Sequence, residues 1–569
     1  MRTYTHDVLV LGSGLAGLRA ALEVMRASHG ELDLAIVSKT QLMRAHSVCA
    51  EGGTGAVIHP EDGDSLDLHA WDTVKGSDFL ADQDVVRRFV EAAPGEILQL
   101  EHWGTPWSRR PDGRLDQRPF GGHTYPRATF AADKTGFFEM HALYDTLQRH
   151  SRVTRYEEWM ATRLLLRDGV FAGLVAWSLT TGEVALIRAK AVVIATGGCC
   201  RLFGFTTYSH SVTGDGMVMA YRAGFPLQDM EFVQFHPTGL VPSGILITEA
   251  ARGEGGYLKN RGDARFMEAY AAKMMELAPR DIIARAETTE IESGRGFQHP
   301  SGLGYVHLDL THLGRARILE RLPLIREVAI KFNGIDPIEA PLPVRPAAHY
   351  SMGGIACDID GKVVDGVWAA GEVACMSLHG ANRLGTNSTA ECLVWGAITG
   401  REAARWARAS RAVPDAPTAE AEAEEARLAT LLDARGPENQ YEIRTRLRLL
   451  MDEKVGVFRT GPGLEEALAE IHTLREQSSR IHLDDRSWIY NTDLVSALEL
   501  ENLLDLAQVM VAGALARTES RGAHARRDFP SRDDERWLVH TRAHYTPDGP
   551  RLEYTPVTIT TWKPVERKY

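Results

Sequence analysis

Short apolar runs and amphipathic stretches alternate at the start of the chain. Residues 6–11 form an apolar run typical of a buried parallel strand, residues 15–28 have helical periodicity, and residues 32–37 form a second apolar run. This order predicts a strand–helix–strand unit. Parallel strands need helices to cover them, so the unit indicates an α/β fold.

A glycine pattern lies between the first predicted strand and helix. Gly12, Gly14 and Gly17 form G-x-G-x-x-G, which predicts a bound dinucleotide with its pyrophosphate at the helix N-terminus. The acidic ribose ligand expected about 20 residues further on is absent. Ser38-Lys39 stands there instead. A serine hydroxyl can still bind a ribose, so the dinucleotide prediction holds without its usual marker for NAD.

Two later apolar runs end in small or acidic residues. Residues 191–198 and residues 367–372 read as buried strands that return to the dinucleotide fold after long insertions, as a two-part flavin domain requires. Glu372 is well placed to bind a ribityl or ribose hydroxyl, and the alternative is a solvated loop acid. Asp215, in Thr-Gly-Asp-Gly, leaves the same two possibilities open.

The last third of the chain has a different pattern. Residues 413–425 read as an exposed linker or a solvated helix start. Residues 444–454 and 463–477 have amphipathic helical periodicity, and residues 493–518 form a long apolar helical stretch that we expect to pack in a bundle. Residues 551–561 alternate as a strand does.

Composition limits the classes of function. The 569 residues are 44% hydrophobic and 25% charged, which is ordinary for a soluble globular protein. The net charge of −12 argues against a general binder of nucleic acid or anionic membrane. No apolar run is long enough to span a bilayer. An anionic substrate would therefore need a local basic pocket.

The six cysteines carry no metal-binding pattern. None of them forms a C-x-x-C pair, so we expect no metal site and no iron–sulfur cluster within this chain. Sparse cysteines without a pattern fit a reducing cytoplasm.

A histidine lies close behind the first strand–helix–strand unit. His46 is flanked by small residues and followed by the pair Gly52-Gly53, which would let backbone approach a planar ligand closely. We expect a covalent bond between His46 and a flavin. The alternative is a loop histidine with ordinary hydrogen bonds.

Basic side chains recur beside small residues in the second third of the chain. A single arginine or histidine of this kind is more often a structural hydrogen-bonding group than a ligand-binding one. Together, however, these side chains predict a pocket for a dicarboxylate at a flavin face, since arginine binds carboxylate bidentately. The five segments are residues 236–239, 248–256, 279–281, 348–354 and 379–388.

These motifs together resemble the flavoprotein subunit of succinate dehydrogenase and fumarate reductase. The resemblance covers nearly the whole chain. It runs through G-S-G-L-A-G (12–17), M-R-A-H-S-V-C-A-E-G-G (43–53), W-S-R-R-P-D-G (107–113), F-G-G (120–122), F-A-A-D-K-T-G (130–136), M-E-F-V-Q-F-H-P-T-G (230–239), T-E-A-A-R-G-E-G-G (248–256), A-H-Y-S-M-G-G (348–354), G-A-N-R-L-G-T-N-S (380–388), N-T-D-L (491–494) and E-S-R-G-A-H (519–524).

The resemblance implies a role for each site residue. Arg280 matches the proton-transferring arginine, with Glu249 and Arg252 as its relay to solvent and His236 beside it. The dicarboxylate would be held by Phe120, His236, Thr248, His349 and Arg383. The glycine turn, the strand ends and the family motifs together predict FAD contacts at His46 (covalent), Gly12, Ser13, Gly14, Gly17, Ser38, Lys39, Ser47, Ala50, Gly52, Gly53, Ala195, Thr196, Gly197, Asp215, Glu372, Arg383, Ser388 and Thr389.

The resemblance also implies a fold. It is a Rossmann-like FAD-binding domain with an inserted capping domain, then a helical domain and a small C-terminal domain. The expected bounds are 1–235 and 350–405 for the FAD-binding domain, 236–349 for the capping domain, 406–520 for the helical domain and 521–569 for the C-terminal domain.

The implied activity is the interconversion of succinate and fumarate by hydride transfer at covalent FAD. Electrons would pass to an iron–sulfur subunit, which holds the clusters and joins this chain to membrane anchor subunits. The expected location is peripheral, on the cytoplasmic side of the membrane. No nucleic acid is expected as a partner.

Two other functions remain open. One is L-aspartate oxidase, a soluble relative that uses the same site residues but lacks a flavin-linking histidine, so His46 counts against it. The other is a non-catalytic flavin-binding or assembly protein, and the complete set of basic site residues counts against that. Departures at Ser13, at Leu15 and in the short segment 256–280 bear on the physiological direction of the reaction.

Overall fold

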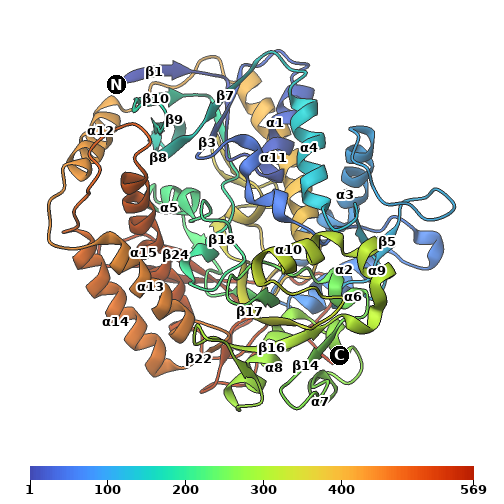
Figure 1. Ribbon diagram of the computed structural model, residues 1–569. Coiled ribbons are helices and arrows are strands. Elements are labelled where there is room, and N and C mark those ends of the chain that lie inside the picture. Colours follow the sequence, from blue (N-terminus) through green and yellow to red (C-terminus); the bar gives the residue numbers. More distant parts are fainter. Residues whose placement is uncertain (569) are drawn as a thin grey trace.

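A six-stranded sheet forms the centre of the computed structural model, which describes residues 1–568 (Figure 1). The strand order is β19-β20-β11-β2-β3-β7, and every neighbouring pair is parallel except β19 with β20. The predicted apolar runs at 6–11, 32–37, 191–198 and 367–372 therefore lie in one sheet. The bounds are β2 (Val8–Leu11), β3 (Leu34–Ser38), β7 (Val153–Glu157), β11 (Ala191–Ile194), β19 (Lys362–Val364) and β20 (Val367–Ala369).

Closely packed helices cover this sheet. Helix α1 (Leu15–Ala27) packs against α11 (Asn387–Ala409), and α4 (Thr135–Leu147) lies beside α1 (Figure 1). Glycines make the close packing possible, because a Cβ on Gly400 would lie 2.4 Å from the carbonyl oxygen of Ala20. Helices α2 (Leu66–Gly76) and α3 (Gln83–His102) pack together and α3 also contacts α11.

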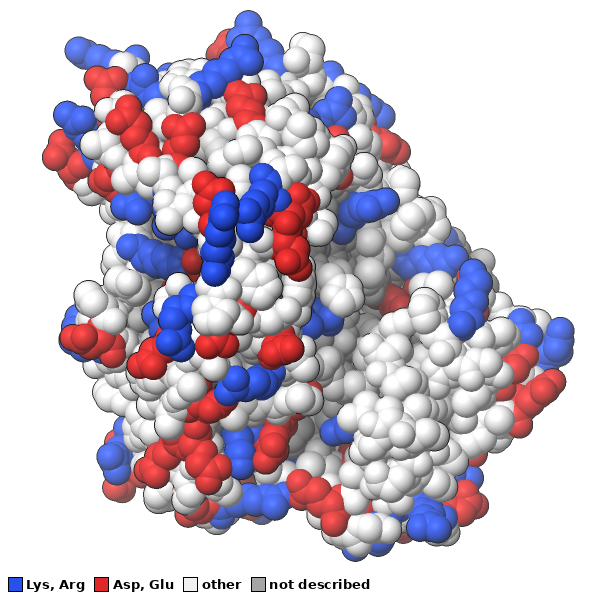
Figure 2. Space-filling view, turned by 60° about the vertical axis from the view of Figure 1, so that its left-hand side comes forward, with Lys and Arg blue, Asp and Glu red and all other residues white. Residues whose placement is uncertain are grey.

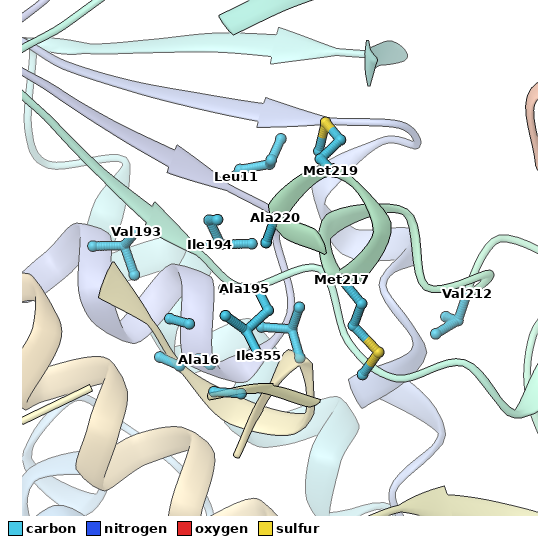
Figure 3. Packing of buried hydrophobic residues seen from close by; sticks show 14 of the residues in the cluster. Leu11, Ala16, Val193, Ile194, Ala195, Val212, Met217, Met219, Ala220 and Ile355 are labelled. Atoms are coloured by element: carbon cyan, nitrogen blue, oxygen red, sulfur yellow. The ribbon is translucent and has the colours of Figure 1, made fainter. Parts of the chain in front are cut away.

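The carboxyl ends of the central strands are held in an apolar core. Leu11 and Ile194 lie close to Ala220 of helix α5 (Asp215–Arg222), and Met217 of the same helix lies nearby (Figure 3). All four side chains are buried. This packing fixes the edge of the sheet at which the glycine turn begins.

Three further sheets belong to the same part of the molecule. A four-stranded sheet has the order β1-β10-β9-β8, a small one has the order β4-β6-β5, and a third has the order β21-β18-β12-β24-β25. Their bounds are β1 (Arg2–Thr5), β4 (Thr54–Gly55), β5 (Gln117–Arg118), β6 (Ala128–Thr129), β8 (Trp159–Arg167), β9 (Val170–Ser178), β10 (Val184–Arg188), β12 (Leu227–Gln228), β18 (Gly354–Ala356), β21 (Ala374–Cys375), β24 (Val539–His544) and β25 (Arg551–Pro556).

A second hydrophobic core, built from residues between Leu240 and Val344, is separate from the main one. It lies inside the predicted capping segment, whose bounds remain a prediction. Around it the sheet β13-β17-β16-β14, with β15 paired to β16, packs against α8. The elements are β13 (Val233–Leu240), α6 (Ala250–Gly253), β14 (Tyr257–Lys259), α7 (Met267–Tyr270), α8 (Arg280–Glu292), β15 (Phe297–Gln298), β16 (Gly304–Asp309), α9 (Gly314–Arg321), α10 (Pro323–Asn333) and β17 (Leu342–Ser351).

Four helices follow the second FAD-binding segment in the described part of the chain, along the left side of Figure 1 from α12 at the top to α14 at the bottom. They are α12 (Thr418–Leu432), α13 (Gln440–Lys454), α14 (Gly461–Ser478) and α15 (Thr492–Ala516), with the short pair β22 (Phe458–Arg459) and β23 (Ala525–Arg526) beside them. The helices predicted at 444–454, 463–477 and 493–518 are confirmed. Both possibilities for residues 413–425 are found: residues 413–417 have no regular structure, and α12 begins at Thr418.

The strand predicted at 551–561 is too long. Strand β25 ends at Pro556, because the backbone beyond it bonds to the start of α3. Thr558 N–H donates to Asp82 at 2.6 Å, and the Gln83 side-chain oxygen accepts the N–H groups of residues 560–562. A glutamine side chain thus takes the place of a partner strand.

We expect Gly17→Ala to destabilise the protein. The added Cβ would lie 2.1 Å from the carbonyl oxygen of Gly12, so helix α1 must move away from the strand end. Overpacking of this kind costs about 1–3 kcal/mol. Thermal unfolding measures the loss.

Gly95→Ala is the matched control for this change. Gly95 lies in helix α3 with nothing within 4 Å of an added Cβ. Alanine is the better helix former, so this variant should be about 0.5–1 kcal/mol more stable. Equal melting temperatures for the two variants would contradict the packing argument.

His540→Asn should remove a pH-dependent stabilisation. His540 on β24 bonds to Asp229 at 2.7 Å and to Asp82 at 3.3 Å. Burial alone would lower the pKa of His540, but the two carboxylates raise it from 6.5 to about 10. The stabilisation is therefore complete below pH 6.5 and is lost as the pH rises through 10.

Denaturant unfolding at several pH values measures this dependence. The deficit of the variant should be largest near pH 6 and shrink toward pH 10. His544→Asn, on the same strand, breaks only the surface pair with Glu553 and should change little. A deficit that stays constant with pH would contradict the assignment.

Candidate active site

A cavity of about 960 Å³ lies where the carboxyl ends of the central strands meet the second core. This volume is at the upper end of the range for small-molecule sites and suits a dinucleotide. Most residues predicted for the site line it, whereas Gly17 and Arg252 lie behind its wall. The predicted residues on the wall are Gly12, Ser13, Gly14, Ser38, Lys39, His46, Ser47, Ala50, Gly52, Gly53, Phe120, Ala195, Thr196, Gly197, Asp215, His236, Thr248, Glu249, Arg280, His349, Glu372, Arg383, Ser388 and Thr389.

The outer surface carries charges of both signs. Figure 2 shows acidic and basic side chains interspersed over one face, with a hollow that leads into the molecule. This face therefore carries no patch of positive charge that would bind an anionic substrate. The positive charge for such a substrate must come from the cavity wall.

The glycine turn forms one end of the cavity. Gly12 has φ +108°, and a Cβ there would lie 2.2 Å from the carbonyl oxygen of Ala195, so only glycine fits. Gly14 caps helix α1 without a side-chain bond, and the hydroxyl of Ser47 accepts the N–H of Leu15. Residues 12–16, from the glycine turn into the start of α1, line the cavity, and a helix N-terminus is a suitable site for a pyrophosphate.

Lys39 ties the end of β3 to two other segments. Its ammonium bonds to Asp215 at 2.6 Å and to Glu499 of α15 at 2.7 Å. Ser38 bonds to Ser13 through their hydroxyls at 3.0 Å. The serine thus lies where the missing ribose acid was expected, and the lysine is an anchor between elements as well as part of the wall.

His46 lies in a single turn of 3₁₀ helix on the wall. Its ring stacks on Tyr208 with the centroids 4.8 Å apart, and its Nδ1 accepts the N–H of Ser209 at 3.4 Å. Burial lowers the pKa of His46 to about 4, so the imidazole is neutral at physiological pH. A neutral imidazole keeps a lone pair for bond formation.

Glu372 lies on the cavity wall, not on the outer surface. Its carboxyl accepts the N–H of Ser351 at 2.8 Å and the hydroxyl of Tyr208. Burial raises the pKa of Glu372 to about 8, so the protonated form predominates at pH 7. A solvated loop acid is excluded, and the carboxyl can exchange hydrogen bonds with a polyol.

Basic side chains from four elements converge at the other end of the cavity. They are His236 on β13, Arg280 at the start of α8, His349 on β17 and Arg383 in the loop before α11. The two imidazole rings lie 4.8 Å apart between centroids. Segments that are more than 100 residues apart in the chain therefore form one site.

Burial gives the four groups different charge states. Burial, together with the nearby charge of Arg280, lowers the pKa of both His236 and His349 well below 6.5, so both rings are neutral. Burial followed by the charge of Arg280 lowers the pKa of Arg383 to about 10, which still leaves it a cation at pH 7.

Glu249 lies between two buried arginines. Its carboxylate accepts from Nε of Arg280 at 2.7 Å and lies 3.4 Å from Nη2 of Arg252. Burial alone would raise the pKa of Glu249, but the two guanidinium groups lower it to about 2. Glu249 caps the short helix α6, so its three-residue spacing from Arg252 does place both on one face.

Small residues bring Phe120 and Thr248 to this end of the cavity. A Cβ on Gly52 would lie 2.7 Å from the Phe120 ring and 3.7 Å from the Thr248 hydroxyl. Glycine at position 52 therefore lets the aromatic ring and the hydroxyl approach the same point.

Sequence reasoning missed three residues of the site. Gln234 donates to the backbone of Arg383 at 2.7 Å and accepts from Arg280 at 3.1 Å. Tyr350 lies under Arg383, 4.4 Å from guanidinium to ring centroid. Both fall inside quoted motifs, beside the predicted His236 and His349. Tyr208 lies in an irregular segment with no sequence signal.

Comparisons with known proteins agree with this geometry. A model described as "FAD binding domain" matches residues 7–389, and one described as "Fumarate reductase flavoprotein C-term" matches residues 444–569. The chain belongs to the fumarate reductase and succinate dehydrogenase flavoprotein family. It is thus an FAD-type oxidoreductase subunit with the expected α/β fold.

Named relatives match over nearly their whole length. The fumarate reductase flavoprotein subunit of Mycobacterium tuberculosis is 49% identical, with 100% of both chains covered. That of Escherichia coli is 44% identical, covering 100% of this chain and 96% of the relative. The succinate dehydrogenase flavoprotein subunit of Rickettsia bellii is also 44% identical, with 98% and 96% covered.

Solved structures match equally well. A chain of an E. coli quinol fumarate reductase variant has a TM-score of 0.97 at 44% identity, covering 100% of this chain and 99% of that one. Mycobacterium smegmatis Sdh1 has a TM-score of 0.86 at 35% identity, covering 99% and 96%.

Proposed function

We propose that this chain catalyses the interconversion of succinate and fumarate as the flavoprotein subunit of a larger complex. The observation that carries the proposal is the ion-pair series Arg280–Glu249–Arg252, which ends on the cavity wall beside Arg383 and two neutral histidines. Such an arrangement can bind a dicarboxylate and move a proton at the same place.

The substrate end of the cavity suits two carboxylates. Arg383 is a buried cation whose guanidinium keeps Nε without a hydrogen-bond partner among residues 1–568. A carboxylate would satisfy that group bidentately. His236, His349 and Thr248 offer further hydrogen bonds to the second carboxylate, and Phe120 closes the apolar side. These contacts orient and polarise the substrate.

Arg280 is the proposed proton donor and acceptor at the substrate carbon. An arginine is a weak acid in water, with a pKa above 12. The Nε of Arg280 donates to the carboxylate of Glu249 at 2.7 Å, so an acceptor for the proton is already in contact with it. Glu249 then accepts or returns that proton, and Arg252 continues the series away from the substrate.

The residues around the cavity fit FAD. The pyrophosphate would lie at the start of α1, the ribose near Ser38, the ribityl chain near Glu372 and the ring system beside His46. Bound flavin supplies the hydride chemistry that this chain's own residues lack. Further contacts are proposed for Ala195, Thr196, Gly197, Ser388 and Thr389, all of which line the same cavity.

We also propose that FAD is joined to the ring of His46, which its neutral imidazole permits. Electrons would leave to an iron–sulfur subunit that is held on the cytoplasmic side of a membrane by anchor subunits. Support comes from relatives described as quinol–fumarate reductase and as Sdh1 in complex with UQ1. Among residues 1–568, no helix is both long and apolar enough to cross a membrane.

His46→Ser should abolish the covalent flavin. Denaturing electrophoresis followed by in-gel fluorescence should show a fluorescent wild-type band and a dark variant band. The variant should still bind FAD without a bond, since the glycine turn is untouched. A dark band from wild-type holoenzyme that retains FAD would contradict the covalent link.

Arg280→Gln should lower kcat for succinate oxidation by about 10²–10⁴-fold, as loss of the acid–base group does. The KM should change far less, because Arg383 and the histidines remain. Dye-coupled assays with succinate and with fumarate measure both constants.

Arg285→Gln is the matched control on the same helix. Its guanidinium bonds to Asp281 and to the carbonyl of Gly522, away from the cavity. Its kcat should stay close to that of the wild type. A wild type that oxidises L-aspartate but not succinate would contradict the proposed function.

A further inference from the structure

A second set of buried charges lies behind the proton series. Glu287 on α8 is fully buried, and neither of its carboxyl oxygens has a hydrogen-bond partner in the described part of the chain. Nε of Arg252 and Nε of Arg345 share this condition within residues 1–568, whereas Nη2 of Arg252 has its ion pair with Glu249. Buried polar groups without protein partners are generally bridged by ordered water.

Helix geometry places Glu287 on the face of α8 that carries Arg280. Seven residues make almost two helical turns, so the two side chains lie on one face about 10 Å apart along the axis. Ala284 lies between them and is buried. This face packs against β13 and β17, and β17 carries Arg345.

We propose that Glu287 extends the proton series beyond Arg252 and supplies protons to it through bridging water. This rests on the proposed function. Glu287 is a relay residue and not a catalytic one, because it does not line the cavity and can act only through Arg252. Its carboxyl oxygens and the Nε–H of Arg252, all without a hydrogen-bond partner within residues 1–568, are the two ends of the added step.

The direction of the pKa shift of Glu287 agrees with its role as a proton donor. Burial raises the pKa of Glu287 well above its usual range, and the charges of Arg252 and Arg345 offset this only in part. Burial therefore favours the neutral carboxyl, which is the form that can give up a proton. Glu249 is the opposite case, since it stays ionised between its two arginines.

A partly exposed group connects this set to the outside. The charges of Glu287 and of Asp452 on α13 both act on Arg345. Asp452 accepts the N–H groups of Gly204 and Phe205 at 3.1 and 3.0 Å, and its side chain is only partly buried. The order Arg252, Glu287, Arg345, Asp452 therefore leads from the relay to the partly exposed carboxylate on α13.

One proton moves at each step and no other bond changes. During fumarate reduction, Arg280 gives its proton to the substrate carbon and regains one from Arg252 through Glu249. Arg252 regains its proton from the carboxyl of Glu287 through water. The Glu287 carboxylate is then reprotonated by solvent at the Arg345 side. Succinate oxidation runs the same steps in reverse.

Glu287→Gln tests this in the holoenzyme complex. The amide keeps the size and polarity of the side chain but cannot carry the proton. With fumarate and a reduced viologen dye, kcat should fall by about tenfold or more while KM stays unchanged. The ratio of kcat in H₂O to kcat in D₂O should rise, because proton supply becomes limiting. Glu287→Asp should recover most of the rate.

Glu290→Gln is the matched control. Glu290 lies on the same helix and is also buried, but it bonds to Asn260, Tyr270 and Arg295, away from Arg252. This variant loses more hydrogen bonds than Glu287→Gln does. If the loss of a buried carboxyl on α8 acted only through the structure, Glu290→Gln would lower the melting temperature and the flavin content at least as much as Glu287→Gln does.

The outcomes separate the two proposals. An active wild type with an unchanged kcat and isotope ratio in Glu287→Gln overturns the role of Glu287 alone. A wild type that turns over neither fumarate nor succinate contradicts the proposed function, and with it this role. A lowered kcat and a raised isotope ratio in Glu287→Gln, with Glu290→Gln unchanged, support it.

Discussion

The placement of one carboxylate between two arginines is the constraint on which the site depends. Glu249 is almost fully buried, and so are Arg252 and Arg280. A buried charge without a partner costs several kcal/mol, so none of the three could remain ionised here alone. The two ion pairs of Glu249 fix the starts of α6 and α8 relative to each other, and thereby the wall that faces the substrate.

The protein as a whole is acidic, yet its cavity gathers cations. The net charge is −12. The repulsion among these cations is limited because His236 and His349 are neutral. The two rings add hydrogen-bond donors and acceptors to the cavity without adding charge. Local charge is then confined to the arginines, whose fork geometry matches carboxylates. Long-range attraction contributes little to such a site, and short-range hydrogen bonding sets its selectivity.

The predictable parts of the structure are those with local signals. Buried parallel strands read as continuous apolar runs, so the strands that hold Leu11, Ile194 and Ala369 were evident. Glu287 was not, because the acids at 287, 290 and 292 resemble a solvated helix face. The end of β25 depended on Gln83, more than 470 residues away. A local sequence pattern cannot predict a contact between residues so far apart in the chain.

The contact of Lys39 with Glu499 joins the dinucleotide end of the cavity to helix α15 across 460 residues of sequence. Asn502 of the same helix donates to Asp215, which Lys39 also binds. Folding of the helical region and completion of the cofactor pocket are therefore thermodynamically linked. A chain that ended before residue 499 would therefore lack one of the anchors that hold Lys39 at the wall of the cofactor pocket.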